Sequence, residues 1–251
     1  MIKFFRKIRQ NMIKENKVSK YLLYAIGEIV LVVIGILIAL SINNWNENRK
    51  NNDKETAILL NLKTEFETNK EDLIETIGRN SEKYNLVKKI LSFTGQPNDN
   101  LTKETSDEMI YNIFTGHSAD ISTGFINDLL NSGNIYLIKS DSLRNQLTNW
   151  EKELIDYKIE SEDDFKTFYN TILIPFMVKN YSYEIRVNIV LPDLKFNSTF
   201  TDDYKSIYKL REFENIVITK LALLDYVNNS YKSLIAIIDQ ILLQIEKEIK
   251  K

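Results

Sequence analysis

Few residues of this 251-residue chain have the type and spacing that catalysis or metal binding requires. The chain has no cysteine and a single histidine, His117, which excludes thiolate metal sites, cysteine nucleophiles and sites built from several histidines. Ser206 and Lys209 match the Ser-x-x-Lys pattern of some acyl-transfer enzymes, but the Ser-Asp-Asn and Lys-Thr-Gly elements that accompany it are missing. We therefore expect no catalytic residue, no bound metal, no cofactor and no enzymatic activity.

Two further polar features are weak candidates for a site. The acidic run at 160–164 offers carboxylates to a divalent cation, but it lacks the glycine and the spacing of a calcium loop. It is more typical of a solvated helix face. His117 lies in the polar segment 116–120 without a partner at catalytic or ligand spacing, which predicts a surface residue.

Glu28 is the more informative ionisable residue, because it is the single charge within the 22-residue apolar stretch Tyr21–Ile42. A carboxyl group at that depth in a bilayer is costly and usually faces protein or water. On a helix, Glu28, Gly35 and Ala39 share one stripe, and the last two have the spacing that lets helices approach closely. This stripe predicts a transmembrane interface. The alternatives are a tolerated polar residue or a proton-handling carboxylate of the stator type.

The stretch Tyr21–Ile42 itself predicts a transmembrane helix. As a helix it is about 33 Å long, enough for a hydrocarbon core of about 30 Å. Tyr21 and Tyr24 at one end and Trp45 at the other are expected to anchor it at the membrane interfaces. A cleaved signal peptide is the alternative, but its apolar core would be shorter. We expect an uncleaved anchor.

The distribution of charge predicts the topology. Residues 1–20 hold seven basic residues and one acidic residue, while residues 43–251 are net acidic. The positive-inside bias places the N-terminus in the cytoplasm and residues 54–251 in the periplasm, anchored in the inner membrane. The acidic remainder argues against nucleic-acid binding.

Residues 1–20 also have apolar positions at helical spacing, which favours an amphipathic segment lying on the cytoplasmic leaflet; a disordered basic tail is the alternative. The residues expected to contact anionic lipid are Lys3, Arg6, Lys7 and Arg9. The predicted partner of this part of the chain is the lipid bilayer.

After the polar linker at 43–53, apolar periodicity predicts a long-helix bundle at 54–251. Only seven glycines and three prolines interrupt the chain. Asn69 and Asn80 occupy apolar seam positions, where a polar group can fix the register. Lys220 is the one exception in the heptad seam of the last helix. The helices are expected at 54–91, 105–114, 124–131, 142–179 (with Pro175 ending or kinking it) and from Leu210 to the C-terminus.

One segment is ambiguous. Residues 181–191 alternate apolar and polar, which favours a strand, and Pro192-Asp193 offers a turn into a return strand ending near residue 200. The competing interpretation extends the preceding helix. The predicted fold is therefore all-α, a transmembrane helix followed by a long-helix bundle, with a β-hairpin near 181–200 as the open alternative.

The N-terminal residues resemble those of a known family. KFFRKIRQ, KYLLYAIGEI, LVVIGILIAL and INNWNE are similar to the N-terminus of an uncharacterised Bacteroidota (flavobacterial) membrane-protein family of unknown function. Beyond residue 50 the resemblance is looser and rests on segments such as GFINDLLNSGNIYLI. It implies an inner-membrane anchor and a periplasmic helical domain, and no activity.

These observations favour a membrane-anchored structural or interaction protein of the cell envelope. We expect a homo-oligomer or an association with another envelope membrane protein. The alternative is a periplasmic sensor or a stator-like accessory subunit that acts through its transmembrane helix and would require a separate effector.

Overall fold

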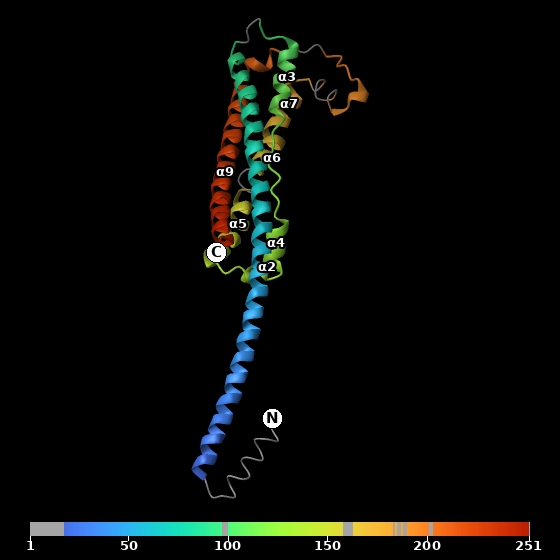
Figure 1. Ribbon diagram of the computed structural model, residues 1–251. Coiled ribbons are helices and arrows are strands. Elements are labelled where there is room, and N and C mark those ends of the chain that lie inside the picture. Colours follow the sequence, from blue (N-terminus) through green and yellow to red (C-terminus); the bar gives the residue numbers. More distant parts are fainter. Residues whose placement is uncertain are drawn as a thin grey trace. The chain divides into compact units, whose positions relative to one another are not determined.

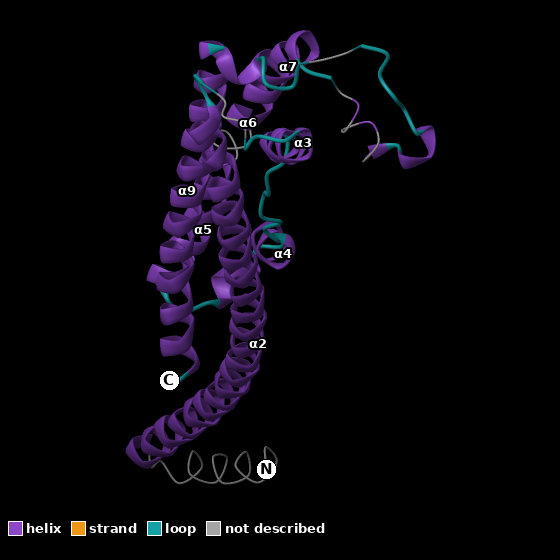
Figure 2. Ribbon diagram, turned by 90° about the horizontal axis from the view of Figure 1, so that it is seen from above, coloured by secondary structure: helices purple, strands orange, loops and turns teal. Residues whose placement is uncertain are grey.

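The computed structural model describes residues 18–96, 100–157, 163–182, 184, 187, 190–200 and 203–250. These residues form helices joined by turns and extended segments, with no strand among them (Figure 2). The all-α prediction is confirmed. The chain divides into two compact units, Met1–Ala57 and Ile58–Lys251.

Helix α2 spans Val18–Ile90 and is the longest element of the chain. It contains the predicted transmembrane stretch and also residues 43–53, which the sequence assigned to a short linker and which are helical. The reason is local. Neither glycine nor proline occurs between Gly35 and Gly78, so no residue in that interval breaks the hydrogen-bond ladder.

In the unit Ile58–Lys251, the later part of α2 packs against α9, Arg211–Ile249 (Figures 1 and 2). Lys63 pairs with Glu246 at 3.1 Å and Lys70 with Asp239 at 2.6 Å. Because the lower number on α2 meets the higher number on α9, the two helices are antiparallel. The seam of α9 is buried as predicted, although Leu210 is exposed. Its buried members are Phe213, Val217, Lys220, Leu224, Val227, Tyr231, Leu234, Ile238, Ile241 and Ile245.

Shorter helices complete this unit. The predicted helices near 105–114 and 124–131 are confirmed as α3, Lys103–Ile113, and α4, Gly124–Asn131. Helix α5, Asp141–Tyr157, begins after Ser140, whose hydroxyl accepts a hydrogen bond from the backbone N–H of Leu143.

The helix predicted at 142–179 contains a π-helical stretch, and residues 158–162 within it lie outside the described part of the chain. After α5 the chain forms α6, Asp163–Thr167, the π-helical segment η4, Phe168–Leu173, and α7, Ile174–Asn180. Pro175 is the second residue of α7, directly after the π-helical turn, where its missing N–H leaves no regular α-helical hydrogen bond unmade.

The β-hairpin near 181–200 is also corrected. Of that segment the structure describes residues 181, 182, 184, 187 and 190–200, and none of these lies in a strand. Pro192–Leu194 forms a single 3₁₀ turn instead. Leu191, Leu194 and Phe200 are exposed, so the apolar face that would have stabilised a hairpin has nothing to pack against.

Candidate functional site

The first candidate site is the apolar part of α2 in the unit Met1–Ala57. Glu28, Gly35 and Ala39 lie on this one helix, and its periodicity places them on one face. Glu28 is half-buried. A side chain built at Gly35 would meet nothing within 4 Å, so this face has room for a second helix. Among the described residues, this is the one helix long and apolar enough to cross a membrane.

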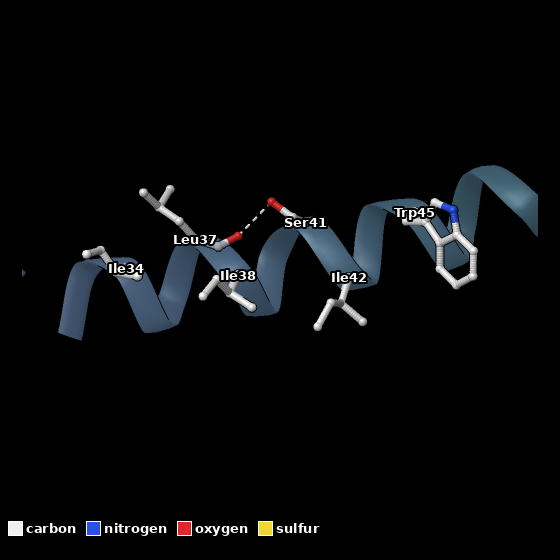
Figure 3. A pocket seen from close by; sticks show the side chains of 6 residues that line it. All are labelled: Ile34, Leu37, Ile38, Ser41, Ile42 and Trp45. Carbon is white, nitrogen blue, oxygen red and sulfur yellow. Dashed lines mark hydrogen bonds between the residues drawn. The ribbon is translucent and has the colours of Figure 1, made fainter. Parts of the chain in front are cut away.

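Figure 3 shows a shallow apolar groove at the end of this stretch, lined from Ile34 to Trp45 by α2 alone. The hydroxyl of Ser41 donates to the carbonyl of Leu37 at 2.8 Å, so this polar group is satisfied within the helix and needs no partner in the surroundings. Trp45 is 66% exposed, and the guanidinium of Arg49 lies 5.6 Å from its ring centroid. An open apolar face ending in a Trp–Arg pair suits a lipid interface.

Several predicted contact residues lie outside the described part of the chain. Lys3, Arg6, Lys7 and Arg9 belong to residues 1–17, and with them lies the predicted amphipathic segment. Tyr21 and Tyr24 lie within α2, but their side chains are also outside the description.

The second candidate site lies in the unit Ile58–Lys251. Here the extended segment 115–123, named the strap, lies along the surface of α2 and is hydrogen-bonded to it. Two buried asparagines of α2 bind its backbone. Asn69 donates to the carbonyl of Ser122 and accepts from the Ser122 N–H, both at 2.8 Å. Asn80 makes the same pair of bonds with His117 at 2.9 and 3.1 Å. Each amide therefore satisfies two main-chain groups, as a neighbouring strand would.

Acidic residues of α2 bind the backbone of the strap and of the helix that follows it. The carboxylate of Asp72 accepts from the Asp120 N–H at 2.8 Å. The carboxylate of Glu65 accepts from the N–H groups of Phe125 and Ile126 at 2.9 and 3.0 Å. These two donors lie in the first turn of α4, where a negative charge also complements the helix dipole. The apolar periodicity of α2 predicted the seam positions of Asn69 and Asn80, whereas no sequence pattern marked Glu65 and Asp72 as binding residues.

Beneath one end of the strap lies Lys220 of α9, whose side chain is fully buried. Its ammonium nitrogen donates to the hydroxyl of Tyr169 at 3.1 Å and lies 4.6 Å from the ring centroid of Phe165. A Cβ added at Gly116 would stand 3.4 Å from that nitrogen, so the strap covers it closely. Tyr169 belongs to the π-helical segment η4, a distortion that often accompanies functional sites.

Electrostatics favour the neutral amine at this position. Burial, and to a smaller extent the positive charge of Lys83, lowers the pKa of Lys220 to about 7. Lys83 is itself partly buried, which lowers its pKa, and it donates to the side-chain carbonyl of Asn112 at 2.6 Å. The pKa of His117 is also lowered, by burial and then by the charges of Arg79 and Lys83. Lys220, Lys83 and His117 thus form a basic, partly desolvated region.

The described residues offer no group of three or more His, Asp or Glu side chains that could hold a metal ion. Of the acidic run at 160–164, the structure describes Asp163 and Asp164, which begin α6; Asp163 faces Lys166 at 3.7 Å. His117 is tied to α2 through its backbone.

A family model described as a family of unknown function, DUF6090, matches residues 28–172, more than half of the chain. The chain belongs to this family. The match begins at Glu28 and includes α2 from that residue, the strap and helices α3 to α6. No curated protein and no solved structure matches this DUF6090 chain.

The strap of the DUF6090 chain gives a direct prediction. Asn80→Ala removes the partner of two main-chain groups, and we expect it to lower the free energy of unfolding by about 1–3 kcal/mol. Urea titrations of the full chain in detergent micelles, followed by circular dichroism, measure this. Asn61→Ala, at an exposed position of the same helix, is the matched control. Equal effects at the two positions would mean that the strap contributes nothing to stability.

Proposed function

We propose that this chain is a single-pass membrane protein of the bacterial cell envelope that acts as a structural or interaction module. The observation that carries the proposal is the apolar surface of α2. The large aliphatic side chains described between Leu22 and Ile42 are about half exposed or more. Soluble proteins rarely leave so large a contiguous apolar surface in water, whereas a bilayer solvates it.

The topology follows from the charge bias. Seven basic residues precede the apolar stretch, so we place residues 1–20 in the cytoplasm and the helical unit Ile58–Lys251 in the periplasm, with the anchor in the inner membrane. The helical unit has a net acidic sequence and lacks a complete catalytic motif. We therefore assign it a binding role toward envelope proteins and neither an enzymatic role nor nucleic-acid binding.

The transmembrane partner in this proposal is a second helix, from another copy of the chain or from another envelope membrane protein. It would pack on the stripe of Glu28, Gly35 and Ala39. Close backbone approach at the small residues gives van der Waals contact, and the carboxyl group of Glu28 would be shielded from lipid by the same contact.

A fusion and an extraction experiment test the anchor. We expect alkaline phosphatase fused to the C-terminus to be active in a bacterial host, and the full-length chain to stay in the membrane pellet in carbonate. The matched control is the double variant Ile34→Lys, Ile38→Lys, which should move the chain out of the pellet because charge at the bilayer centre is costly. An inactive fusion, or a product beginning near Ile42, would exclude an uncleaved anchor.

Three variants test the stripe by cysteine crosslinking in native membranes, which a chain without native cysteine allows cleanly. Gly35→Ile should reduce crosslinking because it separates the helices; Gly27→Ile is the control off the stripe, since neither site is crowded within one chain. Glu28→Gln should be tolerated and Glu28→Leu should not, because only glutamine keeps a hydrogen-bonding group. Unaltered crosslinking in all three variants would exclude a helix–helix interface on the stripe, and the apolar stretch would then serve as an anchor only.

A further inference from the structure

Three basic side chains lie close together where the strap meets α2. Arg79 and Lys83 are four residues apart on α2, so their side chains are neighbours on one helix face. A like-charge pair at this spacing lowers the stability of a helix. His117 of the strap lies near both, because burial and then the charges of Arg79 and Lys83 lower the pKa of its imidazole.

The nearby acidic groups do not neutralise this positive charge. Glu75 lies 3.7 Å from the guanidinium of Arg79, but both side chains are exposed, and such a pair contributes little to stability. Among the described residues no carboxylate forms an ion pair with Lys83 or with the buried Lys220. Their ammonium groups donate to neutral oxygens instead, those of Asn112 and Tyr169. The region therefore holds an excess of positive charge.

The basic groups are also held in place by hydrogen bonds. The guanidinium of Arg79 donates to the hydroxyl of the buried Thr76 at 3.1 Å, which leaves most of its five N–H donors available. The ammonium of Lys83 donates to Asn112 at 2.6 Å and has two further donors. The backbone of His117 is fixed by Asn80, and the residue is exposed to solvent. Donors that are already ordered lose less entropy when they bind a ligand.

We propose that Arg79, Lys83 and His117 together bind a phosphate group. A guanidinium donates two parallel hydrogen bonds to phosphate oxygens, and an ammonium adds a compact positive charge. His117 gains a third charge when the bound anion favours its protonated form. A phosphate dianion offsets two positive charges and a carboxylate only one, so we expect the site to prefer phosphate.

Lys220 adds to this preference without touching the ligand. Its amine lies 3.4 Å from the position of a Cβ at Gly116, directly beneath the residue that precedes His117. A dianion above the strap would therefore also favour the protonated form of Lys220. The site goes beyond the proposed function and does not depend on whether α2 crosses a membrane, so the two proposals fail separately.

His117 is the single histidine of the chain, so its imidazole NMR signals report on this site without overlap. The full chain in phosphatidylcholine nanodiscs is titrated with inorganic phosphate, and separately with acetate, at pH 7.5 and constant ionic strength. We expect phosphate to shift the His117 ring protons with saturation and to bind at least tenfold more tightly than acetate. The pKa of His117 should rise in the presence of phosphate, because the bound anion favours the imidazolium.

Two variants remove one charge each from the site. Arg79→Gln and Lys83→Gln should each weaken phosphate binding at least tenfold. Lys88→Gln, at an exposed position of the same helix, changes the net charge equally and is the matched control. Circular dichroism of each variant checks that it is folded. Equal losses in all three variants would reduce the binding to general attraction by a basic surface and would overturn the site.

The absence of a saturable His117 shift with phosphate, or equal affinities for phosphate and acetate, would also overturn the proposal. Nanodiscs that contain phosphatidic acid, whose headgroup is a phosphate monoester, identify the source of the phosphate group. A His117 signal already at its phosphate-bound position before phosphate is added assigns the site to a lipid headgroup. An unmoved signal that then responds to inorganic phosphate assigns it to a soluble phosphate.

Discussion

Leu234→Asp is expected to lower the free energy of unfolding of the helical unit by about 4–6 kcal/mol. Leu234 is 3% exposed in the core that α9 shares with α2 and α5. Removing a buried leucine side chain costs roughly 2–5 kcal/mol, and an unpaired buried carboxylate adds to that cost. Because domains are stable by only about 5–15 kcal/mol, the variant should unfold at low urea concentration or during expression.

The same substitution at Leu243 is the matched control. Leu243 lies on the same helix and is 56% exposed, so Leu243→Asp buries no charge and should change stability by less than about 0.5 kcal/mol. Urea titrations of the full chain in micelles, followed at the helical circular dichroism band, compare the two variants. Similar midpoints for both would place the core on another face of α9.

The strength of that prediction reflects how much of the fold the sequence determines. The buried face of α9 could be predicted from the spacing of its apolar residues alone, because a helix in a globular unit buries such a stripe. Apolar residues of the predicted helix 54–91 follow similar spacing, and Leu62, Phe66 and Leu73 among them are fully or nearly fully buried. Local periodicity suffices where packing is repetitive and the partner is another helix.

Periodicity does not suffice where the partner is irregular backbone. Asn69 and Asn80 were expected to fix helix register, yet their partners are the main-chain groups of Ser122 and His117. Main-chain groups carry no sequence signature, and neither does the hydrogen bond that Glu65 accepts at the start of α4. The strap was therefore not predictable as a structural element.

The π-helical irregularity in the helix predicted at 142–179 has a related cause. Apolar residues continue at nearly helical spacing through Phe168–Leu173, so the pattern alone does not distinguish an α-helix from the π-helical segment η4. The π-helical turn at Phe168–Leu173 shifts the register locally, and it places Tyr169 beside Lys220. That contact depends on a backbone irregularity.

Lys220 was nevertheless marked by the sequence, as the one basic residue in an apolar seam. A lysine at such a position either extends its amine to solvent or is desolvated with its charge suppressed. The structure shows the second arrangement, with the amine enclosed by Phe165, Tyr169 and the Gly116 backbone. The anomaly was visible in the sequence, but the surrounding groups were not.

Lys220→Met is expected to stabilise the helical unit most at low pH. In the unfolded chain this amine keeps its proton up to its ordinary pKa of 10.5, whereas burial lowers the pKa to about 7 in the folded protein. Below pH 7 the buried charge lowers the free energy of unfolding of the wild-type protein by its full amount. This destabilisation decreases as the pH rises toward 10.5, because the folded protein no longer holds the proton. Methionine has no such charge, so its advantage over wild type should shrink by about 3 kcal/mol between pH 6 and pH 9.5.

Urea titrations of both proteins at the two pH values measure this change, and ionisable groups that do not interact with Lys220 cancel in the difference between variant and wild type. Lys232→Met, at an exposed position of α9, controls for the loss of a lysine and should differ little from wild type at either pH. If Lys220→Met instead destabilises the protein equally at both pH values, the hydrogen bond to Tyr169 and the two aromatic rings outweigh the cost of desolvation. If its advantage grows with pH, Lys220 is charged in the folded state and must have an acidic partner.

An advantage confined to low pH would mean that the protein retains a lysine under its strap at a cost in stability, which is typical of a residue kept for function.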